Sequence, residues 1–127
     1  MNAARRYGNV QAETASPQRI MVLLFETALK HMRAARSLFD QGKRSEAITL
    51  CTKASDIVIE LHSTLDSRHA PELCATLASL YQFTCARLLK AACAQSGNAA
   101  AVHEAERAFA PLVDAFAGAV EKVARGG

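Results

Sequence analysis

The sequence predicts an all-α protein, an antiparallel up-down four-helix bundle with an N-terminal arm. Half of the 127 residues are apolar and 21% are charged, which is enough apolar material for one hydrophobic core. The chain has no Trp, 6% aromatic residues, six Gly and three Pro, so it is poor in the residues that favour strands and tight turns. At this length we expect one domain, with residues 1–16 as the arm and helix cap and residues 17–127 as the bundle.

The first helix is expected at about residues 17–41. Residues 1–15 have no sustained apolar period and are therefore assigned to the arm. Ser16 is a good N-cap, and Pro17 suits the first helical position, where its missing N–H loses no hydrogen bond. Apolar residues then recur at steps of three and four and form one stripe: Met21, Leu24, Phe25, Ala28, Met32, Ala35 and Phe39.

Two further helices are expected at about residues 45–66 and 71–95. Ser45 can cap the first of these, and Pro71 fits the opening turn of the second. Gly97 suits the position just past the end of a helix. The apolar rhythm continues through both segments, with Ala47, Leu50, Cys51, Ala54, Ile57, Val58, Leu61 and Leu65, and then Leu73, Leu77, Leu80, Tyr81, Thr84, Leu88 and Ala91.

Asn98 can cap a last helix that contains a proline. Pro111 cannot donate a hydrogen bond to the Arg107 carbonyl, and an interior proline costs ~3 kcal/mol in a regular helix. A kink is therefore expected near residues 107–111. Because the four helices are joined by short connections, sequence neighbours must pack antiparallel, which gives the up-down bundle.

No motif for catalysis, a cofactor or a metal is present, and we expect neither an enzyme nor a cofactor. The four histidines, His31, His62, His69 and His103, lack the Glu-x-x-His pairs of di-iron bundles. The cysteines, Cys51, Cys74, Cys85 and Cys93, lack C-x-x-C spacing and are interpreted as small buried apolar residues in a reducing compartment. Glu104 and Glu106 are assigned to a solvated polar helix face.

Charge and hydropathy exclude two classes of partner. The net charge of +3 is too small for a dedicated nucleic-acid binder, and no partner of that class is expected. The longest apolar run, residues 20–25, is far below the ~20 residues that span a bilayer, so we expect a cytoplasmic protein. Lys30, Arg33 and Arg36 form a basic stripe that either favours the helix macrodipole or binds an acidic partner surface.

Some apolar residues fall outside the main stripes. Ile20 and Leu23 widen the stripe of the first helix, and Ile59 lies off the stripe of the second. A contiguous apolar patch of this kind marks a partner site. An arm carrying Tyr7 and Val10 could cover such a patch, or be displaced from it by the helix of a partner.

Several segments resemble the FliS family of flagellar secretion chaperones. The run from Tyr7 to Phe25 contains a tyrosine, an Ala-Ser-Pro helix opening and an apolar stretch ending in Leu-Phe, as that family does. The segments 61–66, 80–83 and 87–91 are similar to the end of its second helix and to the core of its third. The late Ala-Trp pair of the family stands here as Ala115-Phe116.

The resemblance implies a non-enzymatic cytoplasmic chaperone. It would bind the disordered C-terminal segment of flagellin, prevent premature polymerisation and deliver flagellin to the type III export apparatus, with the export gate as a second partner. The residues expected to contact the partner are Tyr7, Val10, Ile20, Leu23, Ile59 and Tyr81. Two alternatives stay open, a phosphotransfer bundle with His31 as the phosphate acceptor and a scaffold bundle without a client, and self-association is also open.

Overall fold

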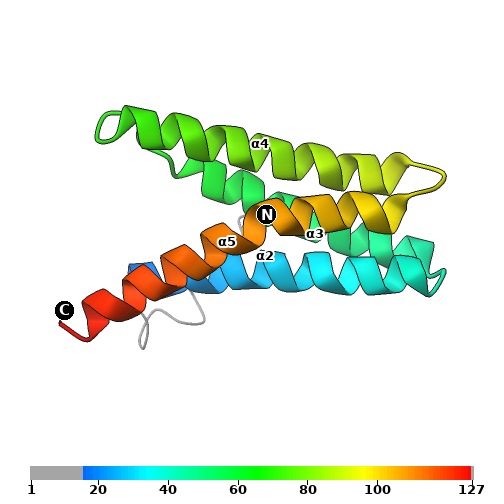
Figure 1. The fold of residues 1–127 in the computed structure, drawn as a ribbon, viewed down its shortest axis with the longest axis horizontal. Helices are drawn as coiled ribbons and strands as arrows, with labels where there is room; N and C mark the ends of the chain where they lie inside the picture. Colours follow the sequence, from blue (N-terminus) through cyan, green and yellow to red (C-terminus); the bar gives the residue numbers. More distant parts are fainter. Residues whose placement is uncertain (1–15, 127) are drawn as a thin grey trace.

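The computed structural model describes residues 16–126, and these form four α-helices without a strand. They are α2 (Pro17–Asp40), α3 (Arg44–Ser63), α4 (Pro71–Cys93) and α5 (Asn98–Ala124). Each helix packs against the next in sequence, and α2 also packs against α5, so the four helices form a closed ring (Figure 1). The predicted all-α, up-down four-helix bundle is confirmed for this part of the chain. The predicted arm residues 1–15, including Tyr7 and Val10, lie outside the described residues.

The start of α2 follows the prediction closely. The Ser16 hydroxyl accepts a hydrogen bond from the Arg19 backbone N–H at 3.2 Å, and Pro17 occupies the first helical position. At the other end, Gly42 has a φ of 76°, a left-handed conformation that glycine adopts without strain. Its N–H donates to the Phe39 carbonyl, and the Lys43 N–H donates to the Leu38 carbonyl, which completes a Schellman motif.

The predicted cap of α3 is wrong. Lys43 stands at the N-cap without a side-chain hydrogen bond, and Ser45 already lies inside the helix. The Schellman turn at Gly42 leads the chain directly from one helix into the next, so α3 begins one residue before the serine.

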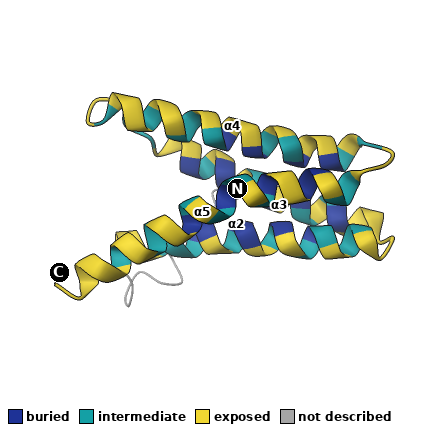
Figure 2. Cartoon of the chain, in the orientation of Figure 1, coloured by how far each residue is buried: buried dark blue, intermediate teal, exposed yellow. Residues whose placement is uncertain are grey.

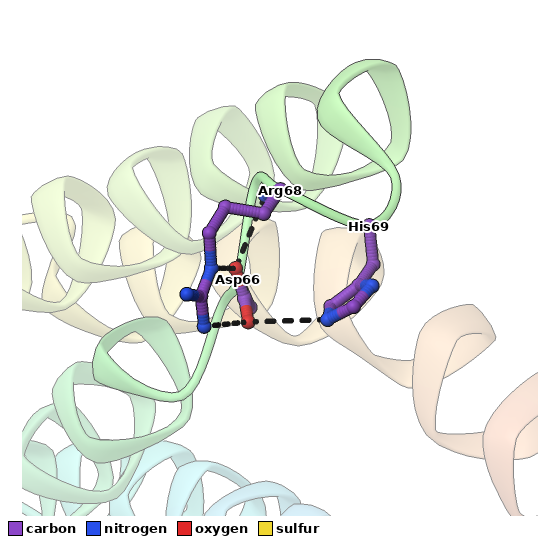
Figure 3. A network of polar contacts seen from close by, with 3 residues as sticks. All are labelled: Asp66, Arg68 and His69. Atoms are coloured by element: carbon purple, nitrogen blue, oxygen red, sulfur yellow. Dashed lines mark hydrogen bonds and ion pairs between the residues drawn. The ribbon is translucent and has the colours of Figure 1, made fainter.

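The helix α3 ends at Ser63, three residues before the predicted end at Asp66. It ends early because Asp66 organises the connection to α4 (Figure 3). Its carboxylate accepts hydrogen bonds from the Arg68 backbone N–H at 3.1 Å and from the Arg68 guanidinium at 2.9 Å. These hydrogen bonds lower the pKa of Asp66, and His69 lies 3.6 Å from the same carboxylate. A side chain that accepts a hydrogen bond from the backbone N–H two residues ahead stabilises a tight turn, and this competes with continuation of the helix.

Asn98 stabilises a helix end, but not the one predicted. The N-cap of α5 is Gly97, with a φ of 72°. The Asn98 side-chain amide instead donates to the carbonyls of Ala91 and Ala94, at 2.6 and 2.7 Å. Those carbonyls belong to the end of α4, where carbonyl groups have no partner within the helix. The residue therefore ties the end of α4 to the start of α5.

The helix α5 continues through Pro111, and its axis changes direction along its length, as Figure 1 shows. The first part lies alongside α4, and the last turns project beyond the bundle toward the C-terminus. No residue of α5 beyond Val113 is buried, in agreement with the exposed outer turns in Figure 2.

Aromatic rings in the core connect α2 with α5. Phe25 on α2 lies 5.7 Å from Phe109 and 5.0 Å from Phe116, measured between ring centroids. Phe116 is the residue at the position where the resembled family has Trp, and here it packs partly buried against the core. Thr84 is the one fully buried polar side chain in the described core, and its hydroxyl donates to the Leu80 carbonyl at 2.9 Å.

Replacing Pro111 by alanine is expected to stabilise the protein by about 1–3 kcal/mol, because it restores the N–H donor for the Arg107 carbonyl and removes the ring that crowds that carbonyl. Urea unfolding followed by far-UV circular dichroism measures the change. Pro71→Ala is the matched control, since Pro71 stands in the first turn of α4, where a proline N–H is not needed. Equal effects of both substitutions would contradict the assignment of strain to position 111.

Candidate docking groove

A groove runs along the seam between α3 and α4. Its wall on α3 is built by Cys51, Ser55 and Ile59, which follow each other at steps of four and therefore share one helix face. This section has a volume of about 310 Å³. The remaining lining residues are Thr52 on α3 and Cys85, Leu88, Leu89 and Ala92 on α4.

A second section of about 220 Å³ continues the groove toward the α3–α4 connection. It is lined by Val58, Ile59, His62, Tyr81, Gln82 and Cys85. Because both sections share Ile59 and Cys85, they form one groove with these two residues at its centre. We call it the α3/α4 groove.

Two large apolar side chains stand exposed at this groove. Ile59 is 58% exposed on α3, and Leu89 is 65% exposed on α4. Both belong to the lining, so the exposed apolar surface is contiguous with the groove instead of scattered. Contiguous apolar surface on a monomer is typical of a site that binds another protein.

Two thiols and the phenol in the α3/α4 groove are held in their neutral forms. Burial raises the pKa of Tyr81 to about 12 and that of Cys51 to about 11. Burial also raises the pKa of Cys85, and the Asp56 carboxylate adds to that effect. The His62 ring lies edge-on to Tyr81 at a centroid distance of 6.3 Å. A lining of neutral thiols, a phenol and aliphatic groups suits the apolar face of a helix.

A second groove, the α2/α5 groove, lies where α5 crosses the start of α2. It has a volume of about 540 Å³. Val123 is 74% exposed there, the most exposed of the large apolar side chains in the described chain. The lining consists of Ser16, Gln18 and Arg19 from the start of α2 and of Ala119, Val120, Val123 and Ala124 from the end of α5.

Four of the six predicted contact residues lie in the described part of the chain, and the structure brings two of them together. Ile59 and Tyr81 line the same section of the α3/α4 groove, although Tyr81 is only 4% exposed. Ile20 and Leu23 are half-buried on the first turns of α2 and line neither groove. The sequence reasoning missed Cys85 and Leu89, because the cysteine was assigned to the core and the leucine follows directly after a residue of the main stripe.

The basic stripe of α2 is largely engaged within the protein. Arg33 lies 3.2 Å and Arg36 lies 3.4 Å from the two carboxylate oxygens of Glu106 on α5. Arg36 also lies 2.6 Å from Nδ1 of His103. The Glu106 side chain is only 12% exposed, so its assignment to a solvated polar face is wrong. None of the three basic residues stands in the last turn of α2, which weakens the macrodipole explanation.

The described residues that could act in phosphotransfer or hold a metal do not gather into a site. His31 is half-buried with its pKa lowered, first by burial and then by Lys53 and Lys30, and it lines neither groove. Among residues 16–126 no cluster of His, Cys, Asp or Glu could hold a metal ion. No helix in the same range is long and apolar enough to cross a membrane.

The four cysteines are free but not equally buried. Cys51 is buried, as predicted, whereas Cys74 and Cys85 are only half-buried. Cys93 is exposed, so the prediction of four buried cysteines is wrong for this one. It occupies the last residue of α4, where the helix leaves the core.

Comparison with known proteins places this architecture in a family. The family model described as "Flagellar protein FliS" matches residues 1–123. The curated flagellar secretion chaperone FliSB of Pseudomonas aeruginosa is 33% identical over 95 residues, which cover 72% of this chain and 75% of that protein.

Thiol labelling is expected to separate the cysteines of the groove from the exposed one. At pH 8, Cys93 should react fastest with a disulfide reagent, because its side chain is exposed. Cys51 should react at least about a hundredfold more slowly, because its pKa of about 11 leaves little thiolate and the side chain is 1% exposed. Stopped-flow absorbance measures the phases, and Cys93→Ser should remove the fast one. Labelling of Cys51 in the fast phase would contradict its burial.

Proposed function

The chain belongs to the FliS family of flagellar proteins, and on that premise we propose that it is a cytoplasmic export chaperone for flagellin. It binds the C-terminal segment of flagellin, keeps that segment from premature polymerisation and assists its type III export. None of these three actions requires a covalent reaction, so the proposed role is non-enzymatic.

The observation that carries this proposal is the continuous α3/α4 groove with exposed Ile59 and Leu89. From Cys51 to His62 the groove follows three turns of α3, which corresponds to about 16 Å of helix rise. A client helix of about eleven residues fits this length. Its apolar residues at steps of three and four would enter between the exposed side chains of α3 and α4.

The chemistry of the groove also suits a client that must later be released. A segment that orders only on binding loses conformational entropy at that moment, so its affinity per unit of buried area is low and its contacts stay reversible. The neutral thiols and phenol of the lining supply apolar contact without ion pairs that would slow dissociation.

The α2/α5 groove is proposed as the site of the arm in the free protein. The groove is lined by Ser16, the residue that directly follows the segment 1–15. Tyr7 and Val10 are the large apolar residues that this segment could place there. Ile20 and Leu23, half-buried on the first turns of α2, remain proposed contacts near the same end of the bundle.

Substituting Ile59 by aspartate is expected to weaken flagellin binding at least about tenfold, because a charge replaces an apolar contact at the centre of the groove. The fold should persist, since the side chain is 58% exposed. Isothermal titration calorimetry against flagellin and against flagellin lacking its C-terminal segment measures the loss. Thr49→Asp, at an exposed position of α3 outside the groove, is the control. Wild-type affinity in both Ile59→Asp and Leu89→Asp would reject the groove as the client site.

Deleting residues 1–15 is expected to leave the bundle folded, because Ser16 caps α2 and the four helices pack a hydrophobic core between them. The affinity for flagellin should change, since an apolar groove is then left uncovered. Thermal unfolding and calorimetry on the same preparations separate the two effects. A truncated protein that does not fold would show that the segment belongs to the core.

A further inference from the structure

The apolar stripe of α4 continues beyond the part of the helix that is buried. Leu73 stands 18 residues, or about five turns, before the fully buried Ala91, so both residues lie on the same side of α4. Leu73 is nevertheless 58% exposed. Leu77, one turn further along, is half-buried. The start of α4 therefore presents the core-facing side of the helix to solvent.

The apolar stripe of α5 shows the same pattern at the opposite end of its helix. Val123 follows the fully buried Ala105 by 18 residues, again about five turns, so it also lies on the core-facing side. Val123 is 74% exposed, and Phe116 and Val120 of the same stripe are half-buried. The start of α4 and the end of α5 lie at the same end of the bundle (Figure 1). Two core-facing apolar surfaces therefore lose their cover there.

Pro111 stands between the covered and the uncovered part of α5. Before it, the Arg87 guanidinium lies 3.5 Å from the Glu104 carboxylate and connects α4 with α5. Beyond it, α5 runs away from the start of α4, as Figure 1 shows. Because Pro111 has no N–H for the Arg107 carbonyl, the helix bends most easily at this residue. We call residues 112–124, which follow the proline, the α5 lid.

In the described position the α5 lid lies against α2 with few buried side chains. The Phe116 ring is 5.0 Å from that of Phe25, measured between centroids. Further along, Val120 and Val123 line the α2/α5 groove. Val113 is the one buried residue of the lid. The contact with α2 therefore leaves most of the apolar stripe of the lid uncovered.

The ion pair between α4 and α5 sets the level at which the lid would meet α4. In antiparallel helices of equal rise, the residue fourteen positions before its arginine is level with the residue fourteen positions after its glutamate, which places Leu73 level with Gly118. Phe116 and Val120 stand on either side of this level, on the core-facing stripe. Leu73 would therefore fit between them, as a side chain of one helix fits between two of its neighbour.

We propose that the α5 lid swings about Pro111 between the described position against α2 and a closed position in which it covers Leu73 on α4. Closing gives up the contact between Phe116 and Phe25 and gains apolar contact of Phe116 and Val120 with Leu73. Each position exchanges one set of apolar contacts for another, which is the condition for two populated states.

The position of the lid is coupled to the α2/α5 groove. Four of the seven residues that line this groove belong to the lid: Ala119, Val120, Val123 and Ala124. The groove therefore exists only while the lid lies against α2. Binding of the arm in this groove, a step that rests on the proposed function, holds the lid open, and release of the arm lets it close over α4.

Double electron–electron resonance on the full chain tests the two positions. A ketone-bearing amino acid that carries a nitroxide replaces exposed Ser67 in the α3–α4 connection and exposed Lys122 in the lid, so that the native cysteines stay in place. We expect a long distance from the described position and a short distance from the closed one. Pro111→Ala should raise the short-distance population at least about twofold, because a straighter α5 continues alongside α4.

Two further variants test the contact with α4 and the coupling to the arm. Leu73→Asp should lower the short-distance population about tenfold, because closing then covers a carboxylate with apolar side chains. Thr49→Asp, which adds the same charge at an exposed position of α3, should leave both populations unchanged. Deletion of residues 1–15 should raise the short-distance population at least about twofold, because the arm then no longer holds the lid against α2.

Three results would contradict the proposal. A single long distance that neither Pro111→Ala nor the deletion changes would exclude the movement. A short-distance population unaffected by Leu73→Asp would exclude α4 as the closed position. A deletion without effect, beside a Pro111→Ala variant that responds, would reject the coupling to the arm. None of these measurements involves flagellin, so their failure would leave the chaperone role to its own test.

Discussion

The contact between α2 and α5, the first and last helices described, closes the bundle, and the rest of the structure depends on it. On this seam the Phe25 ring lies 5.7 Å from that of Phe109 and 5.0 Å from that of Phe116, measured between centroids. Arg33, Arg36 and Glu106 add ion pairs on the same seam. Because this seam joins the helices most distant in the sequence, its formation costs more loop-closure entropy than the contacts between sequence neighbours.

The opposite seam is filled differently, and this difference creates the groove. Between α2 and α5 aromatic rings occupy the space between the helices. Between α3 and α4 the facing positions include the small side chains of Cys51, Ser55, Cys85 and Ala92, which leave volume unfilled. Ile59 and Leu89 stand at the edges of that volume and not inside it. The protein can therefore keep the α3/α4 groove along one seam, and the α2/α5 groove at the outer end of the other, without losing the core that the aromatic rings fill.

The sequence predicted the helices well because their signals are local. The apolar stripes and the cap at Ser16 depend on residues within a few positions of one another. The errors concern side chains whose partners lie elsewhere in the fold. Asn98 binds carbonyls of the preceding helix, and Glu106 pairs with arginines that lie 70 or more residues earlier. Neither partner can be predicted from a local sequence pattern.

The groove was predictable only in part, for the same reason. Ile59 lies off the apolar stripe of its own helix, and this is a local signal. Cys85 belongs to the groove only because the fold brings Ile59 of α3 beside it.

The apolar surplus of the composition is concentrated on α4. Of the five large apolar side chains that are well exposed in the described chain, Leu73, Phe83 and Leu89 lie on this helix and none lies on α2. Helix α4 buries four residues on one side, borders the α3/α4 groove on its flank and presents exposed Phe83 on the far side. With only three charged residues, it has little to solvate those two further surfaces. A helix of this composition is stable in water as part of the bundle, and its remaining apolar surface is best explained by contacts with the α5 lid and with other chains.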